Sequence, residues 1–271
     1  MLLLGLTGSI ATGKSTVSRL VSSPPHSLPL IDADLLARKV VEPGTRAYAQ
    51  ILSHFGPTTP NLLLPAPPRE NGNGKGRPLD RAALGRRVFG NSEERKRDRA
   101  VLNGIVHPAV RWAMVRAVLY YYVRGHWAVV LDIPLLFESG LDVFCGVVLV
   151  VGVRDPGLQM RRLRERDKGL TEGEARDRVL SQGTVAEKAE RAEARGKGRG
   201  VVVWNDGGRE ELGEEVGRVM REVERARSGW WSWWLWGSPV VALVVGLWEV
   251  WRGWGARREF EERKKVEKAK L

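Results

Sequence analysis

Apolar residues fall into five short runs, separated by longer stretches in which apolar and polar positions recur with a helical period. Uninterrupted apolar runs of this length are typical of strands buried on both faces of a parallel sheet. Because strands and helices alternate, we predict an α/β fold with a five-stranded parallel sheet between two helical layers. The predicted strands are residues 2–6, 29–31, 128–131, 147–151 and 201–204, and the predicted helices include 81–89, 92–101, 108–122, 158–168 and 171–195.

Ligands in such sheets bind at the carboxyl ends of the strands. The first strand runs into a stretch that fits the phosphate-binding pattern G-x-x-x-x-G-K-[ST] without a mismatch. Its glycines allow backbone N–H groups to face phosphate oxygens, and the helix that follows adds the positive end of its dipole. The lysine can reach the β- and γ-phosphates, and the serine hydroxyl can ligate Mg²⁺. The predicted nucleotide-binding residues are Gly8, Ser9, Ile10, Ala11, Thr12, Gly13, Lys14, Ser15 and Thr16.

Acidic residues follow two of the other predicted strands. Asp32 and Asp34 come after the second strand, and on an extended segment residues i and i+2 point the same way. Such a pair can hold Mg²⁺ or take a proton from a hydroxyl, and the spacing alone does not separate the two roles. Asp132 follows the strand at 128–131. It is either a further Mg²⁺ ligand or an ordinary residue at a strand end.

Composition narrows the class of protein. At 271 residues and a net charge of +12, the chain suits one α/β domain with polyanionic partners. Basic residues are scattered, and outside the tryptophan-rich C-terminal part no aromatic and basic stacking platform is present, so we predict no nucleic-acid binding.

The only cysteine, Cys145, lies in an apolar run and is predicted to be a core residue. The histidines show no metal-ligand spacing with it, so no zinc is expected. The first strand begins at residue 2, and no targeting segment is expected before it.

The C-terminal part of the sequence has a different character. Eight of the 11 tryptophans lie between residues 230 and 254, and residues 230–251 carry a single charge, Glu249. About 20 apolar residues cross a bilayer as a helix, and tryptophans gather at the membrane interface. We therefore expect residues 228–254 to form a helix that crosses a membrane or lies in its interface, followed by a charged tail over 255–271. Contact with the membrane is assigned to residues 230–251.

These motifs together resemble the dephospho-CoA kinase family, over roughly residues 1–225. The resemblance implies a P-loop kinase core with a helical substrate region and a mobile lid. It places the catalytic domain at residues 1–227, the lid at about 154–195, and a proline- and glycine-rich insertion without chemistry at 57–78. The matching segments are 6–8, 13–17, 31–34, 37–38, 40–44, 54–56, 79–85, 88–89, 107–108, 134–138, 159–163, 166–167 and 205–207.

The reaction implied by the resemblance is the last step of coenzyme A synthesis, in which ATP phosphorylates the ribose 3′-hydroxyl of dephospho-CoA, with Mg²⁺. The resemblance then implies that Asp34 is the base at that hydroxyl and that Lys14 is also catalytic. It implies that Arg162 comes from the lid and contacts the transferring phosphoryl group. Asn205 is expected to lie against the adenine of ATP. Mg²⁺ is expected at Ser15, with Asp32 or Asp132. The predicted acceptor side consists of Asp32, Leu84, Arg86, His107, Leu135 and Glu138.

The sequence also departs from the family pattern. Ser9 and Ala11 stand where the family loop commonly has glycine, and a Cβ there crowds the phosphates if φ must be positive. Two alternatives therefore stay open: another nucleoside or nucleotide kinase, and a membrane-anchored nucleotide-binding scaffold for other enzymes of coenzyme A synthesis. We expect the catalytic domain to be cytoplasmic, with its tail anchored in the endoplasmic reticulum or the mitochondrial outer membrane.

Overall fold

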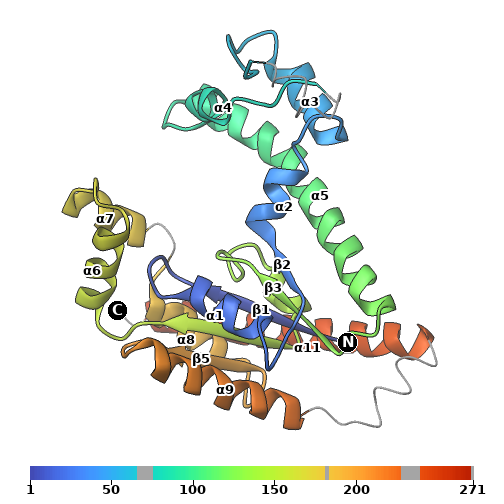
Figure 1. Ribbon diagram of the computed structural model, residues 1–271, viewed down its shortest axis with the longest axis vertical. Coiled ribbons are helices and arrows are strands. Elements are labelled where there is room, and N and C mark those ends of the chain that lie inside the picture. The colour runs from blue at the N-terminus through green and yellow to red at the C-terminus, as the bar shows by residue number, and fades with distance from the viewer. Residues whose placement is uncertain (66–75, 181–182, 227–238, 270–271) are drawn as a thin grey trace. The chain divides into compact units, whose positions relative to one another are not determined.

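The structure is a computed structural model that describes residues 1–65, 76–180, 183–226 and 239–269 (Figure 1). The chain divides into two compact units. The core unit comprises residues 1–31 and 121–271, and the helical unit comprises residues 32–120.

The core unit is built on a five-stranded parallel sheet with the strand order β2-β3-β1-β4-β5. All five predicted strands are confirmed, each within two residues of its predicted ends. In the register of the sheet, Leu2 of β1 lies opposite Ala128 of β3, and Leu4 lies opposite Val147 of β4. The strands are β1 (Leu2–Gly8), β2 (Leu30–Asp32), β3 (Ala128–Asp132), β4 (Val147–Gly152) and β5 (Gly200–Trp204).

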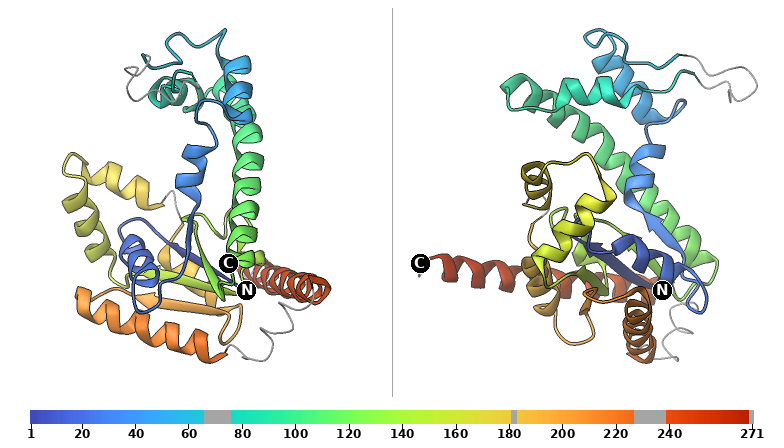
Figure 2. Two further views of the ribbon diagram at one scale, coloured as in Figure 1. Left: turned by 45° about the vertical axis from the view of Figure 1, so that its right-hand side comes forward. Right: turned by 60° about the vertical axis from the view of Figure 1, so that its left-hand side comes forward.

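Two helices cover one face of this sheet, α1 (Lys14–Ser22) and α9 (Arg209–Ala226) (Figure 2). Successive side chains of a strand point to opposite faces, so every second strand residue packs against these helices. Leu4, Leu6 and Leu149 are completely buried there together with Val17 of α1 and Met220 of α9.

The opposite face is covered by α8 (Val185–Glu193) and by the segment after β3, which includes the short 3₁₀ helix η1 (Leu141–Phe144). A Cβ at Gly5 would come within 2.8 Å of the Cys145 Sγ, so only glycine fits beneath this layer. Cys145 is fully buried, which confirms the predicted core position, and burial raises the pKa of its thiol to about 12. With helices on both faces, the predicted three-layer α/β/α arrangement is confirmed.

The region predicted as one helix over residues 171–195 contains two helices, α7 (Glu172–Leu180) and α8. The break includes Gly183, whose φ of 72° lies in the left-handed region that favours glycine. Helix α8 packs on β4 and β5, and α6 (Pro156–Arg166) precedes α7; the predicted lid over residues 154–195 stays a prediction.

The helical unit contains α2 (Ala33–Lys39), α3 (Arg46–Phe55), α4 (Arg81–Val88) and most of α5 (Glu93–Val123). Its core includes Ile51, Phe55 and Val88. The ends of the insertion at 57–78 take part in this packing, since Leu62 is buried there and the Tyr48 hydroxyl donates a hydrogen bond to the Arg77 carbonyl oxygen, at 2.6 Å.

The two helices predicted over 92–101 and 108–122 are one helix, α5, with Pro108 in its interior. Proline normally interrupts a helix because it lacks an N–H and its ring meets the carbonyl of residue i−4. Here α5 nevertheless continues through Pro108 as far as Val123. His107 therefore lies inside a helix, whereas the sequence predicted it just before one.

The last described element is α11 (Pro239–Ala269), a helix of 31 residues. The tryptophan-rich residues 227–238 lie outside the described part of the chain. Within the described ranges, no helix combines the length and the apolarity that crossing a bilayer requires. The predicted membrane-crossing helix therefore has no support there. The predicted charged tail is instead the second half of α11, which is tied to the core unit by ion pairs such as Lys264 Nζ–Glu190 Oε2, at 2.9 Å.

Candidate functional site

The phosphate loop connects β1 to α1 and is packed closely against its neighbours. A Cβ at Gly8 would lie 2.7 Å from the Val151 carbonyl oxygen. Gly13 has a φ of 91° and lies against the Asn205 side chain, so glycine is required for its backbone conformation and for its close contact. No side chain caps the N-terminus of α1. The first turn of this helix thus offers its N–H groups and the positive end of its dipole to an anion.

Lys14 and Asp132 form an ion pair at the carboxyl ends of adjacent strands. The Lys14 Nζ contacts the Asp132 Oδ1, and the Asp132 side chain is almost completely buried. The carboxylate thus lies directly beside the lysine of the phosphate loop, and its assignment as a Mg²⁺ ligand stays a prediction. Ser15, at the second position of α1, is exposed and available to a ligand.

The two residues that replace glycines behave differently. Ala11 has a φ of 60°, in the left-handed region that L-residues with a Cβ rarely adopt. Ser9 has no positive φ; it is buried, and its hydroxyl donates a hydrogen bond to the Gly183 carbonyl oxygen, at 3.2 Å. The steric cost expected from the sequence thus falls on Ala11 alone.

Ala11→Gly is expected to stabilise the protein by up to about 1 kcal/mol in urea unfolding. Relief of the left-handed strain, about 1–2 kcal/mol, exceeds the entropy that glycine adds to the unfolded chain. The matched control is Ser9→Gly, which has no such strain to relieve and loses a buried hydrogen bond, at a cost of about 1 kcal/mol. Equal effects of the two substitutions would contradict this interpretation of the loop.

Buried amides hold the phosphate loop from two sides. The Gln159 Nε2 of α6 donates a hydrogen bond to the Ile10 carbonyl oxygen, at 2.7 Å, and the Asn205 Nδ2 donates one to the Thr12 carbonyl oxygen, at 2.9 Å. Gln159 is 5% exposed and Asn205 is 8% exposed. Sequence analysis gave Gln159 no role, because a buried hydrogen bond across 149 residues leaves no local signal.

Arg162 extends from α6 to the loop that follows β5. Its guanidinium donates hydrogen bonds to the carbonyl oxygens of Asn205, at 2.6 Å, and Gly207, at 3.2 Å. The structure therefore brings Arg162 and Asn205 together at the end of β5. The predicted contact of Arg162 with the transferring phosphoryl group stays a prediction.

The predicted geometry of the acidic pair is wrong. Strand β2 ends at Asp32 and α2 begins at Ala33, so Asp32 and Asp34 do not share one face of an extended segment. The Asp32 Oδ1 accepts a hydrogen bond from the Leu35 N–H, at 2.9 Å, and caps α2. Asp34 lies exposed in the first turn of that helix. Asp32 therefore has a structural role as the cap of α2. The Asp34 carboxylate has no such role in the cap and is exposed to solvent.

The predicted acceptor residues are distributed over both units. Leu84 is buried in the core of the helical unit, and Arg86 and His107 are exposed there. Leu135 and Glu138 belong to the core unit, in the turn after β3, and both are exposed. Leu84 thus has a packing role, whereas Arg86, His107, Leu135 and Glu138 are accessible to a ligand. Asp32, the sixth residue of the set, is half-buried and caps α2.

Comparison with known proteins agrees with these features. The model of the dephospho-CoA kinase family (CoaE) matches residues 2–208. The chain belongs to the dephospho-CoA kinase family. It is 41% identical to dephospho-CoA kinase CAB5 of Saccharomyces cerevisiae, over 84% of this chain and 85% of the yeast protein. It is 47% identical to dephospho-CoA kinase of Geobacillus kaustophilus, over 82% of this chain and 96% of the bacterial one.

Solved structures show the same relationship in three dimensions. The crystal structure of TT1252 from Thermus thermophilus superimposes with a TM-score of 0.59 at 29% identity, over 82% of this chain and 97% of that one. Dephospho-CoA kinase from Campylobacter jejuni superimposes with a TM-score of 0.53 at 25% identity, over 82% of this chain and 96% of that one. The dephospho-CoA kinase match includes the phosphate loop, Asp34, Arg162 and Asn205, and it ends before α11.

Proposed function

We propose that the protein transfers the γ-phosphate of ATP to the ribose 3′-hydroxyl of dephospho-CoA, forming coenzyme A and ADP. The observation that carries the proposal is the phosphate loop with Lys14 paired to Asp132, in a chain that the dephospho-CoA kinase model matches over residues 2–208. ATP is the phosphate donor of this family.

Phosphoryl transfer depends on positioning and on neutralising charge. The backbone N–H groups of the phosphate loop and the N-terminus of α1 bind the phosphate oxygens, and the Lys14 ammonium reaches the β- and γ-phosphates. Ser15 and Asp132 supply hydroxyl and carboxylate oxygens, which are ligands that Mg²⁺ prefers. These residues would hold a magnesium ion, which supplies further neutralisation of the β- and γ-phosphate oxygens when it is bound with ATP.

The acceptor hydroxyl needs a base within hydrogen-bond reach. We assign this role to Asp34: its carboxylate takes the proton from the 3′-hydroxyl as that oxygen bonds to the γ-phosphorus and the bond to ADP breaks. Arg162 stabilises the charge on the transferring group, and Asn205 with its neighbours lies against adenine. These three assignments follow from the family resemblance.

An ADP-release assay with 3′-dephospho-CoA and ATP tests the proposal. Turnover with dephospho-CoA that exceeds turnover with a panel of nucleosides and nucleotides supports it. Preference for a nucleoside would make the protein a different small-molecule kinase. Binding of ATP without turnover of any acceptor would support the scaffold alternative.

We also propose that α11 binds a membrane surface. Several large apolar side chains of α11 point to solvent, among them Leu247, Trp248, Trp251 and Trp254, each at least 55% exposed. Tryptophan favours the membrane interface, and the exposed Arg252 and Arg258 of the same helix suit anionic headgroups.

This proposal predicts co-sedimentation of the full chain with vesicles that contain anionic lipid and weaker co-sedimentation with neutral vesicles. A Trp251→Ser/Trp254→Ser variant is expected to lose most of the binding. Trp112→Ser is the matched control, because Trp112 is 64% exposed but lies on α5. Unchanged binding in the double variant, or concentration-dependent self-association in place of vesicle binding, would contradict it.

A further inference from the structure

Helix α11 turns polar and small residues toward the core unit. The Arg257 Nη1 lies 3.5 Å from the Asp142 Oδ1, and Glu249 pairs with Arg199 at 3.0 Å. Gly253 marks the closest contact, because a Cβ there would lie 2.6 Å from the Val143 carbonyl oxygen of η1. The backbone of α11 can therefore dock on η1 only while residue 253 has no side chain.

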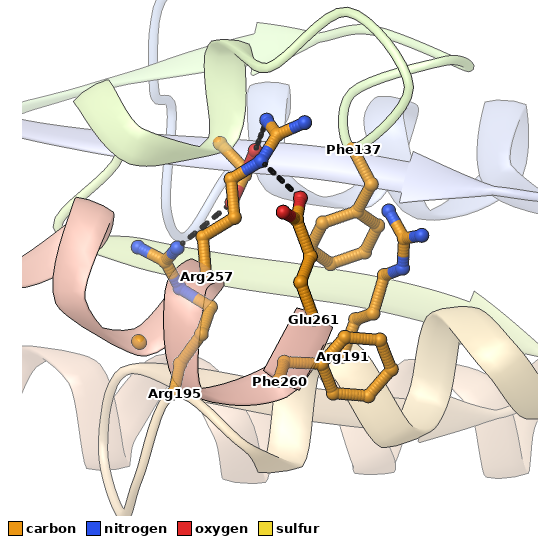
Figure 3. Close-up of a pocket in the computed structure, with 8 residues that line it drawn as sticks. Phe137, Arg191, Arg195, Arg257, Phe260 and Glu261 are labelled. Atoms are coloured by element: carbon orange, nitrogen blue, oxygen red, sulfur yellow. Dashed lines mark hydrogen bonds and ion pairs between the residues drawn. The ribbon is translucent and has the colours of Figure 1, made fainter. Parts of the chain in front are cut away.

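Side chains of α11 and α8 line a small cavity, where the two helices make a second contact between α11 and the core unit (Figure 3). The guanidinium carbon of Arg191, on α8, lies 5.4 Å from the ring centroid of Phe260 on α11 and 5.9 Å from that of Phe137. Cations favour such positions near aromatic rings. One arginine of α8 thus contacts an aromatic side chain of α11 and one that follows β3.

Phe137 belongs to residues 133–138, which we call the acceptor loop because Leu135 and Glu138 lie in it. The same helix α8 holds this loop through Lys188, which is only 2% exposed. The Lys188 Nζ donates a hydrogen bond to the Pro134 carbonyl oxygen, at 3.0 Å, and lies 3.4 Å from the Glu138 Oε1. Burial lowers the pKa of Lys188, while Glu138 partly compensates.

We propose that α11 is a positioning element for the acceptor loop and acts through Arg191 and Lys188 of α8. Removing α11 from its docked position frees Phe260, loosens α8 and shifts the loop that carries Leu135 and Glu138. The affinity for dephospho-CoA then falls, while the phosphate loop keeps its own contacts to Gln159 and Asn205. The inference rests on the proposed acceptor role of this loop.

The test compares Gly253→Val with Gly255→Val in the full chain. Both substitutions place the same β-branched residue in α11, but a Cβ at Gly255 meets no atom within 4 Å. We expect Gly253→Val to raise the KM for dephospho-CoA about fivefold or more, a typical coupling between separate sites. The KM for ATP stays unchanged, and Gly255→Val resembles the wild type. Hydrogen exchange at residues 141–145 rises only in Gly253→Val.

A second pair addresses the aromatic link. Phe260→Ala is expected to raise the KM for dephospho-CoA. Phe260→Tyr keeps the aromatic ring and is expected to have the KM of the wild type. Leu135→Ala tests the loop directly. If Leu135→Ala raises this KM while Gly253→Val and Phe260→Ala do not, the role of α11 is overturned and the proposed function stands. If Leu135→Ala leaves it unchanged, the acceptor role of the loop fails, and the inference with it. Unchanged hydrogen exchange in Gly253→Val would also overturn the docking.

Discussion

Replacing Lys14 by methionine is expected to lower kcat by at least about 100- to 1,000-fold, the cost of losing one preorganised group that stabilises developing charge. In the structure, the Lys14 ammonium lies at the mouth of the phosphate loop and contacts Asp132. Methionine keeps a similar length and removes the charge. The measurement is ADP release at saturating ATP and dephospho-CoA. A kcat within about threefold of the wild type would show that this loop does not neutralise the transferring phosphate.

Loss of the ion pair between Lys14 and Asp132 should also lower the free energy of unfolding. Without Lys14, the buried carboxylate of Asp132 has lost its charged partner, which costs about 1–3 kcal/mol. Asp132→Asn in the Lys14→Met background removes the buried charge and should recover most of this loss in urea unfolding. Turnover should stay low in the double variant. Recovery of stability without recovery of turnover separates the structural role of the pair from its role toward phosphate.

Local patterns predicted most of the core unit. Buried parallel strands appear as uninterrupted apolar runs, and the phosphate loop has a fixed spacing, so both were visible in the sequence. Long-range features were not. Gln159 and Lys188 look like ordinary surface residues of amphipathic helices, and only the assembled fold shows that each is buried and bonded to a distant carbonyl oxygen.

Two predictions of local structure are wrong. Pro108 predicted a helix start, but α5 runs from Glu93 to Val123 with this proline in its interior. Asp32 and Asp34 were placed on one strand, whereas Asp32 forms the cap that begins a helix between them. For the C-terminal segment, no described helix has the length and apolarity that a bilayer crossing requires, and the ion pairs of Glu249 and Arg257 hold α11 against the core unit.

Asp34→Asn is expected to lower kcat by about 100- to 10,000-fold, the usual contribution of a positioned general base. The substitution keeps the shape of the side chain and removes its ability to accept the proton of the 3′-hydroxyl. Affinity for a non-hydrolysable ATP analogue, measured by titration, should stay unchanged, because Asp34 is not among the groups assigned to the ATP phosphates.

Asp32→Asn is the matched control for the base. Asparagine still presents a side-chain oxygen to the Leu35 N–H, and it caps helices as well as aspartate does, so the start of α2 should be preserved. If Asp34 is the base, Asp32→Asn retains kcat within about tenfold. A loss confined to Asp32→Asn would transfer the base to that residue. Equal large losses in both variants would show that the two carboxylates act together, either on the acceptor or on a bound metal ion. Single-turnover rates measured with and without added Mg²⁺ would distinguish these two roles.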